Sequence, residues 1–331
     1  MNALRSRNLR RLRNSCVVSL LAVSTGSLQT QDYNFGPARD SVTKLSQLDA
    51  AIGASRAQLS GLFFGPGHVD VKCSYSCFIG ICLYDRHFTY DVNFASWKPS
   101  MDRLLSAQQQ SSLSFTSYFQ NQFRSWVATV TTINSSLQQA SSQVTQLQTD
   151  LPRLDPATVT QRRQTVQAQL TAISRQIGSS STQVQGLMSQ VAAYLQQQNR
   201  NQDILAQQKT SFATNVNQEL TKMQQFIDSQ PCSGNAWDQF NGFKSRINGS
   251  IDSTDKTLSG LRSSAAASDQ AGSVLLGSMN NMANRMNLVT TQLAQAQTIQ
   301  ATNTALASLH ITVAAQAWQD FSNYASSQVG K

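Results

Sequence analysis

The feature that most constrains this chain is a heptad pattern near its middle. Apolar residues follow one another there at alternating steps of three and four, at Val130, Ile133, Leu137, Ala140, Val144, Leu147 and Leu151. A period of about 3.5 residues draws one apolar stripe along a helix, and only packing against other long helices removes that stripe from water. The same stepping returns in residues 184–194 and 279–296. The sequence therefore predicts a mainly α fold, an elongated antiparallel bundle of very long helices.

The composition is that of helices whose outer faces are exposed to solvent. Charged residues make up only 13% of the chain, and Gln, Ser, Thr and Asn fill the positions away from the apolar stripes. A chain of 331 residues would ordinarily form compact domains. Long helical bundles instead bury their core as a thin rod.

Residues 1–27 differ in composition from the rest of the chain. They contain no Asp or Glu, and five arginines precede an apolar run from Cys16 to Val23, followed by small residues that suit cleavage after Ser24 or Ser27. This pattern predicts a secretory signal peptide and a secreted protein, with a mitochondrial presequence as the alternative. The apolar run is far shorter than the ~20 residues of a membrane-spanning helix.

The net charge argues against nucleic acid as a partner. The formal charge of the whole chain is +9, and it falls to about +4 once the five arginines of the leader are removed. The remaining sequence holds no Lys/Arg stripe interleaved with aromatic residues. We therefore expect no nucleic-acid binding.

A change of period divides the chain after its first predicted helix, residues 37–63. A Gly-Pro-Gly run ends that helix, and apolar and polar residues then alternate strictly. This predicts a β-hairpin over residues 68–95, with an uncharged apolar tip at 78–84. Helical patterns resume at 99 and continue to 328, so the hairpin is inserted between helix 1 and helix 2.

Turns predicted from proline and glycine separate the later helices. One helix reaches Leu151, the next runs from Pro156 to Gln230, and a last helical stretch extends from Ala236 almost to the end of the chain. In an antiparallel bundle the helix ending at Leu151 is shorter than its neighbour by about 35 Å, which two strands of ~33 Å would fill. We therefore expect the hairpin to lie on the two following helices, with its tip near Cys232.

Four cysteines remain after removal of the leader: Cys73, Cys77, Cys82 and Cys232. In an exported protein they predict two disulfides, with three possible pairings. The length argument favours one bridge between Cys232 and the hairpin and a second within the hairpin. A zinc site that includes His68 and His87 is the alternative. The spacing fits no compact zinc module, so no metal is expected.

The sequence carries no catalytic motif. Its three histidines, His68, His87 and His310, lie outside any nucleophile-elbow, phosphate-loop, zincin or dinucleotide pattern. Carboxylates are few and scattered. We predict no catalytic residue, no cofactor and no enzymatic activity.

Long Gln/Ser/Thr/Asn-rich helices interrupted by one apolar, partly β segment resemble the α-helical pore-forming toxins of the cytolysin A, haemolysin BL/Nhe enterotoxin and xenorhabdolysin type. The likeness covers most of residues 37–328. Its most particular element is the C-terminal stretch Leu309, Ala314, Ala317, Trp318, Phe321 and Tyr324. In that family an apolar tongue rests on the bundle and is released into a bilayer as the chains assemble. The resemblance implies a lipid bilayer, and further copies or a second toxin component, as partners.

The predicted membrane-interacting residues are Phe63, Phe64, Phe78, Ile79, Ile81, Leu83 and Tyr84. Together they form more apolar surface than a two-stranded element can bury within itself. Several family members carry their apolar segment between later helices, so residues 271–289 are a second candidate, with core packing the alternative for their methionines. The alternative function is an extracellular coiled-coil structural or adhesive protein with a disulfide-braced hairpin head.

Overall fold

The computed structural model describes residues 33–329, apart from 63, 65–66, 75–84, 95–96 and 231–234. For residues 71–74 and 85–86 it describes the backbone alone. The predicted signal peptide and the apolar tip at 78–84 lie outside the described residues.

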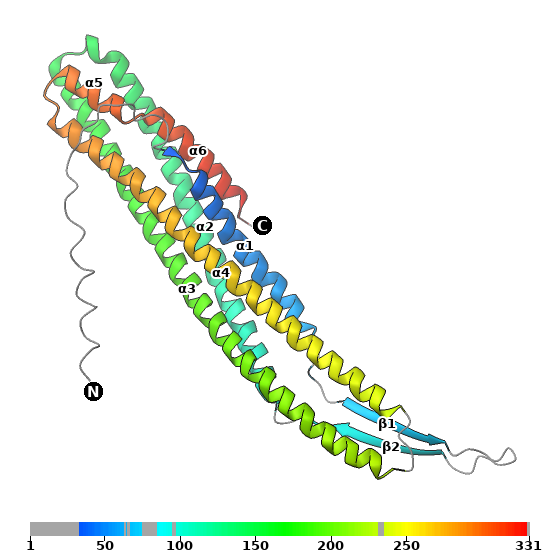
Figure 1. Cartoon of the computed structure of the whole chain (residues 1–331). Helices are drawn as coiled ribbons and strands as arrows, with labels where there is room; N and C mark the ends of the chain where they lie inside the picture. Colours follow the sequence, from blue (N-terminus) through cyan, green and yellow to red (C-terminus); the bar gives the residue numbers. More distant parts are fainter. Residues whose placement is uncertain are drawn as a thin grey trace, which may run out of the picture. The chain divides into compact units, whose positions relative to one another are not determined.

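The described residues form a mainly α unit with one small antiparallel hairpin after the first helix, which confirms the predicted fold class. Helices α2, α3 and α4 run side by side as long rods, and α1 and α6 pack along them (Figure 1). The elements in chain order are α1 (Gly36–Ser60), β1 (Gly67–Ser74), β2 (Asp85–Val92), α2 (Lys98–Asp150), the 3₁₀ turn η2 (Leu151–Arg153), α3 (Pro156–Asp228), α4 (Ala236–Gln295), α5 (Ile299–Ser308) and α6 (Ile311–Ser327).

The heptad stripe of α2 lies inside the bundle. All seven of its apolar residues, from Val130 to Leu151, are buried. They belong to one core, which we call the bundle core, made of residues 38–52 of α1, 115–147 of α2, 159–194 of α3, 261–293 of α4 and the apolar positions of α5 and α6. Burial of a stripe of period 3.5 against neighbouring helices is the packing that the sequence predicts.

The 73-residue helix α3 begins where the sequence places its signals. Asp155 is the N-cap, and its carboxylate accepts hydrogen bonds from the backbone N–H groups of Ala157 and Thr158, with Pro156 in the first turn. The hydrogen bond from the Thr158 side chain is the main cause that lowers the pKa of Asp155. The helix continues through Gly178 without a break.

The last helical stretch, predicted from Ala236 almost to the end of the chain, is divided into three helices in the structure. Ala296 adopts an extended conformation, and Thr298 then caps α5 by accepting a hydrogen bond from Ala301. His310 follows with a left-handed backbone, φ 46°, which ends α5 and redirects the chain into α6. Helix α6 returns along α2, where the Trp318 indole N–H donates to the Val130 carbonyl at 2.9 Å.

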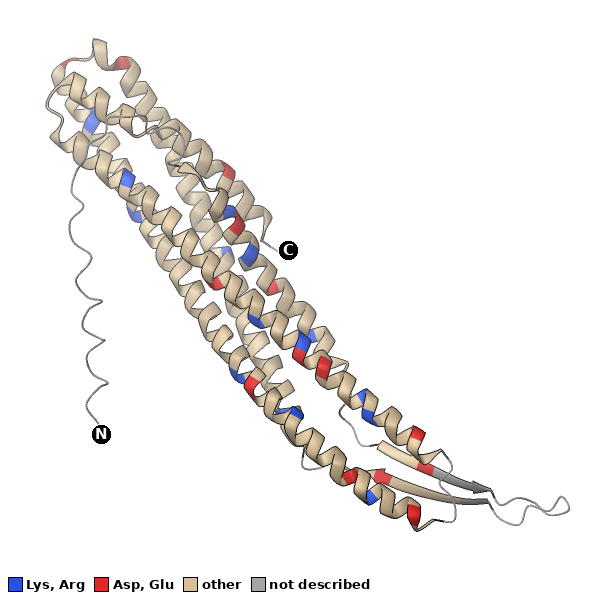
Figure 2. Cartoon of the chain, in the orientation of Figure 1, with Lys and Arg blue, Asp and Glu red and all other residues tan. Residues whose placement is uncertain are grey.

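A second, smaller core lies at the end of the bundle that carries the hairpin. This hairpin-end core consists of Phe64, Val69, Val92, Phe94, Trp97, Met101 and Leu104, with apolar residues from 205–227 of α3 and 236–258 of α4. Charged side chains are sparse over the helices, as Figure 2 shows, so the two apolar cores rather than ion pairs account for most of the packing.

Candidate functional site

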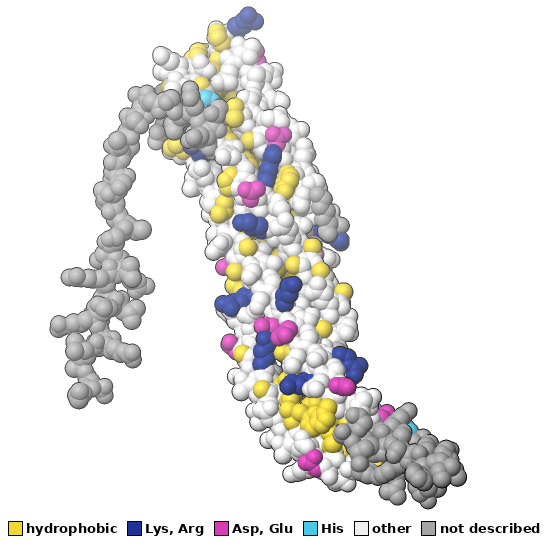
Figure 3. All heavy atoms as spheres, turned by 45° about the vertical axis from the view of Figure 1, so that its right-hand side comes forward, with side chains coloured by type: hydrophobic (Ala, Val, Ile, Leu, Met, Phe, Trp, Pro, Cys, Tyr) yellow, Lys and Arg dark blue, Asp and Glu magenta, His cyan; other side chains and the backbone are white. Residues whose placement is uncertain are grey.

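The hairpin lies on the ends of the two longest helices, as its length predicts. Strand β1 contacts α4 and strand β2 contacts α3. The strands pair in antiparallel register from Gly67 opposite Val92 to Ser74 opposite Asp85. On the face shown in Figure 3, hydrophobic side chains gather near this end of the bundle and are more scattered elsewhere. Val69 and Val92 of the strands belong to the hairpin-end core, and this core therefore packs against the hairpin.

One side chain of α4 binds the outer edge of β1. The Asp70 backbone N–H donates to Gln239 Oε1 at 2.9 Å, and Gln239 Nε2 donates to the Asp70 carbonyl at 2.8 Å. The amide thus takes the place that a neighbouring strand would take beside Asp70, which protects an otherwise open edge. The approach is close, because a Cβ on Gly67 would lie 2.5 Å from the Phe243 ring.

One side chain of α3 binds β2. The Glu219 carboxylate accepts hydrogen bonds from the Tyr90 hydroxyl at 3.0 Å and from the Asn93 backbone N–H at 3.4 Å. Its other oxygen accepts from Lys222 Nζ at 2.7 Å. The Glu219 side chain is only 5% exposed, so a charged group is held under the hairpin by three donors.

Tyr90 is the residue of β2 that makes this contact, and its pKa is shifted by it. Burial, together with the hydrogen bond to Glu219 and the charge of that carboxylate, raises the pKa of Tyr90 to about 12. Its ring also packs on Phe226, with the ring centroids 5.3 Å apart. The hydroxyl therefore stays protonated and continues to donate across the neutral range.

An aromatic cluster closes the base of the hairpin where the chain enters α2. Trp97 packs against Phe212 at 4.8 Å and Phe64 at 5.6 Å between ring centroids, and Phe94 stacks on Phe243 at 5.7 Å. The Trp97 indole N–H donates to the Gln208 carbonyl at 2.9 Å. This base is apolar and buried, whereas the strands beyond it combine buried valines with hydrogen bonds to Glu219 and Gln239.

The outer face of the hairpin is polar. His68 pairs with Asp91, and both side chains are at least two-thirds exposed. The Thr89 hydroxyl donates to Asp70 at 3.1 Å. Because side chains alternate along a strand, this leaves Val69, Tyr90 and Val92 facing the bundle.

Of the residues predicted to meet a membrane, the structure places Phe64, which is buried in the hairpin-end core with 6% exposure. Phe63, Phe78, Ile79, Ile81, Leu83 and Tyr84 lie outside the described residues. So do Cys77, Cys82 and Cys232, and the structure describes only the backbone of Cys73. The disulfide pairing stays a prediction.

The second membrane candidate, residues 271–289, is part of the bundle core. Leu275, Met279, Met282 and Met286 are buried there, while Val274 is 45% exposed. Gly272 lets α4 approach α3 closely, because a Cβ at this position would overlap Met188. In this structure the methionines are core residues, the alternative that the sequence left open.

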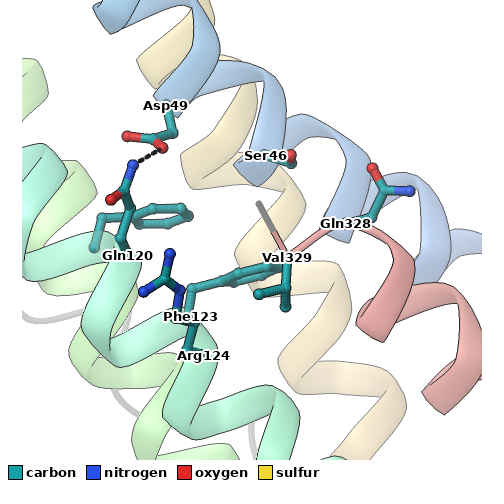
Figure 4. Close-up of a pocket in the computed structure, with 8 residues that line it drawn as sticks. Ser46, Asp49, Gln120, Phe123, Arg124, Gln328 and Val329 are labelled. Atoms are coloured by element: carbon teal, nitrogen blue, oxygen red, sulfur yellow. Dashed lines mark hydrogen bonds between the residues drawn. The ribbon is translucent and has the colours of Figure 1, made fainter. Parts of the chain in front are cut away.

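A small pocket in the bundle is separate from the hairpin. Its cavity of about 220 Å³ lies between α1, α2 and the residues after α6, and Asp49, Arg124 and Phe123 point toward it (Figure 4). Gln120 Nε2 donates to Asp49 Oδ2 at 2.9 Å. None of the predicted site residues lines this pocket.

Within 33–329, less the gaps, no group of three His, Cys, Asp or Glu side chains could hold a metal ion. None of the described helices is both long and apolar enough to cross a membrane.

The sequence patterns do not identify Glu219 and Gln239 as docking residues, although the position of Glu219 is unusual. Glu219 is the only glutamate of the chain, and it lies in the apolar stripe of α3 between Val216 and Met223. A lone carboxylate in such a stripe needs a partner. Gln239 carried no signal, because it is one glutamine among many.

Comparison with known proteins gives distant structural likenesses only. No protein-family model matches the chain, and no curated protein matches it by sequence. Soluble AhlC of the tripartite alpha-pore forming toxin AHL from Aeromonas hydrophila is 14% identical, with a TM-score of 0.41 over 86% of this chain and 97% of that one.

Two further solved structures are similar to a comparable degree. XaxA from Xenorhabdus nematophila is 11% identical, with a TM-score of 0.36 over 87% of this chain and 95% of that one. Soluble SmhA of the tripartite alpha-pore forming toxin Smh from Serratia marcescens is 12% identical, with a TM-score of 0.35 over 90% and 94%. AhlC and SmhA are thus components of the type of toxin that the sequence resembles. With TM-scores below 0.5, these likenesses do not decide the function of this chain.

Proposed function

We propose that this protein is a secreted component of an α-helical pore-forming toxin, which inserts its apolar hairpin into a target membrane and oligomerises there. The observation that carries the proposal is how the hairpin is docked. An amphipathic hairpin rests on the end of a long helical bundle through Glu219, Gln239 and a few buried apolar residues.

The apolar sequence of the hairpin would favour its transfer from water into lipid. Residues 75–84 contain no charged side chain and include Phe78, Ile79, Ile81 and Leu83. Transfer of a few hundred Å² of such surface from water into lipid contributes several kcal/mol at ~25 cal/mol per Å². The net contribution of one hydrogen bond to stability is about 0.5–1.5 kcal/mol between neutral groups, and about 1.5–3 kcal/mol where one partner is charged, as Glu219 is. The hydrogen bonds that hold the strands are therefore of a size that lipid insertion can outweigh.

The proposed partners follow from the same argument. The hairpin would bind a lipid bilayer, and the bundle would assemble with further copies or with a second toxin component. Nucleic acid is not among the proposed partners, because Lys, Arg, Asp and Glu are few along the described helices (Figure 2).

The test is flotation of the purified chain lacking residues 1–27 with vesicles of phosphatidylcholine and cholesterol, together with release of an enclosed dye. A component that inserts co-floats with vesicles even without its partner components. The Ile79→Asp/Ile81→Asp double variant is expected to remain helical and to lose flotation and dye release.

The matched control is Leu288→Asp, because Leu288 is a bundle residue that is 59% exposed. This variant introduces the same chemistry away from the hairpin and should behave as the wild type. If the wild-type chain neither floats nor releases dye over a range of lipids and pH, the proposal is wrong and an extracellular structural or adhesive role takes its place.

A further inference from the structure

We propose that the hairpin end of this protein opens as a separate cooperative unit, and that a layer of buried polar side chains across α2 and α3 is the boundary along which it opens. The unit comprises the hairpin, α2 up to residue 104, α3 from residue 205 and α4 up to residue 258. The inference concerns the folded chain in water and does not depend on the proposed membrane function.

The polar layer separates the two apolar cores. It consists of Gln108 and Ser112 on α2, and Tyr194, Gln198 and Asn201 on α3, all at most 4% exposed. On α2 it fills the interval between Leu104 of the hairpin-end core and Phe115 of the bundle core. On α3 it reaches from Tyr194, at the edge of the bundle core, to Asn201, four residues before the hairpin-end core resumes at Leu205. On α4 the boundary is narrower, because Leu258 and Leu261 belong to different cores.

Hydrogen bonds fix the layer in one arrangement. The Gln108 amide donates to Ser112 Oγ and to the Tyr194 hydroxyl, both at 3.2 Å, and its oxygen accepts from Asn201 Nδ2 at 2.5 Å. Burial raises the pKa of Tyr194, as expected for a hydroxyl withdrawn from water. These bonds tie α2 to α3 in register, because a shift along either helix would separate their partners.

The layer interrupts apolar packing between the two cores, and it includes one amide without a hydrogen-bond partner. Both polar atoms of the Gln198 amide are buried and have no hydrogen-bond partner. A buried polar network with an unpaired member subtracts from the free energy of folding, whereas apolar residues at the same positions would add to it. Cooperative units of a native protein end where such stabilising contacts become few.

The packing of the helices changes at the same level. Helix α1 ends at Ser60, which lines a surface groove together with Gln109 and Leu113 of α2. On one side of the layer four helices, α1 to α4, pack together, and on the other side α2, α3 and α4 pack with the hairpin. Two different arrangements therefore meet at the polar layer, and neither core extends into the other.

Native-state hydrogen exchange of the chain lacking residues 1–27, followed by mass spectrometry of peptides, tests the inference. We expect amides in 205–227 of α3 and 236–258 of α4 to exchange at one common rate, at least about tenfold faster than those in 115–194. That factor corresponds to ~1.4 kcal/mol of difference in opening free energy. Uniform protection from one end to the other, or a boundary at Gly178 instead, would overturn the proposal.

Replacement of the layer gives a second, independent readout. Gln198→Leu leaves the hydrogen-bonded network intact and removes the unpaired amide, so exchange in the hairpin-end unit should slow by about tenfold. The control is Ser180→Ala, which removes an unpaired buried hydroxyl from α3 within the bundle core. By the same argument it should slow exchange within 115–194, if anywhere, and leave the rate of the hairpin-end unit unchanged. If Gln198→Leu also leaves the rate of the hairpin-end unit unchanged, the layer is not the boundary.

Discussion

Two short elements dock on the long helices of this protein, and they are held in different ways. Helix α6 buries Trp318 and Phe321 completely, and Phe35 packs on both rings at 5.3 and 5.1 Å between centroids. The strands of the hairpin bury Val69 and Val92, and polar atoms of Glu219 and Gln239 make their remaining bonds to the bundle.

The difference indicates which element can leave the bundle. A docked aromatic side chain withdraws 150–250 Å² from water, and detachment costs free energy because this apolar surface is exposed again. A hydrogen bond is exchanged for one to water, so its net contribution is about 1 kcal/mol. Helix α6 is therefore docked mainly by buried aromatic rings, while the hairpin combines burial of Val69 and Val92 with hydrogen bonds that water can replace.

Truncation of Trp318 should have the largest effect. Trp318→Ala removes a fully buried indole and its hydrogen bond to the Val130 carbonyl, and we expect a loss of about 3–5 kcal/mol in the free energy of unfolding. Urea denaturation followed by circular dichroism measures it. Val313→Ala, on the same helix and 40% exposed, is the control and should change little. A loss below about 1 kcal/mol would contradict docking of α6 mainly by buried aromatic rings.

Removal of the Glu219 carboxylate comes next. Glu219→Ala leaves the Tyr90 hydroxyl and the Asn93 N–H without their acceptor, so docking of the hairpin should weaken by about 1–3 kcal/mol. Limited proteolysis should then cut residues 67–92 faster while the helices stay intact. Asp203→Asn, an exposed carboxylate on the same helix, is the control. If Glu219→Ala instead unfolds the whole chain, without faster local cleavage in 67–92, the hairpin does not detach independently of the helices.

Truncation of Gln239 should have a smaller effect of the same kind. Gln239→Ala removes two neutral hydrogen bonds to the backbone of Asp70, for which we expect about 1 kcal/mol. Hydrogen exchange at the Asp70 amide is the readout, and it should accelerate about fivefold. Gln225→Ala, at an exposed position of α3, should leave that rate unchanged.

High pH should loosen the hairpin gradually. The folded-state pKa of Tyr90, about 12, lies above the ordinary value of 10.0, so its stabilising contribution is complete below pH 10 and disappears as pH rises through 12. Burial also raises the pKa of Tyr194, so titration by absorbance at 295 nm should show more than one late-ionising tyrosine. Tyr90→Phe should remove one of them, and Tyr118→Phe should remove none. Ionisation of Tyr90 together with exposed tyrosines would mean that it does not donate to Glu219.

Periodicity alone predicts most of this fold. The stripe from Val130 to Leu151 specifies a helix with one buried side, and the change to a period of two marks the strands that follow Gly67. Length matching even places the hairpin on α3 and α4, because an antiparallel bundle leaves that space beside the shorter helix.

The breaks near the end of the chain and the docking contacts could not be predicted in this way. Helix α4 ends at Gln295 without proline or glycine, and the left-handed residue between α5 and α6 is His310. Tertiary packing of Trp318 and Phe321 against α2 and Phe35 overrides the local helical pattern there. The partners of Gln239 and Glu219 likewise depend on a close approach of distant segments, which no local pattern encodes.

The uniqueness of Glu219 has a practical consequence. In a protein that contains one glutamate, isotope labelling of that amino acid alone gives a single side-chain carboxyl resonance. Its chemical shift would differ between a carboxylate enclosed beneath Tyr90 and one surrounded by solvent. This single resonance could therefore be used to measure detachment of the hairpin from α3, without a fluorescent tag or an engineered cysteine.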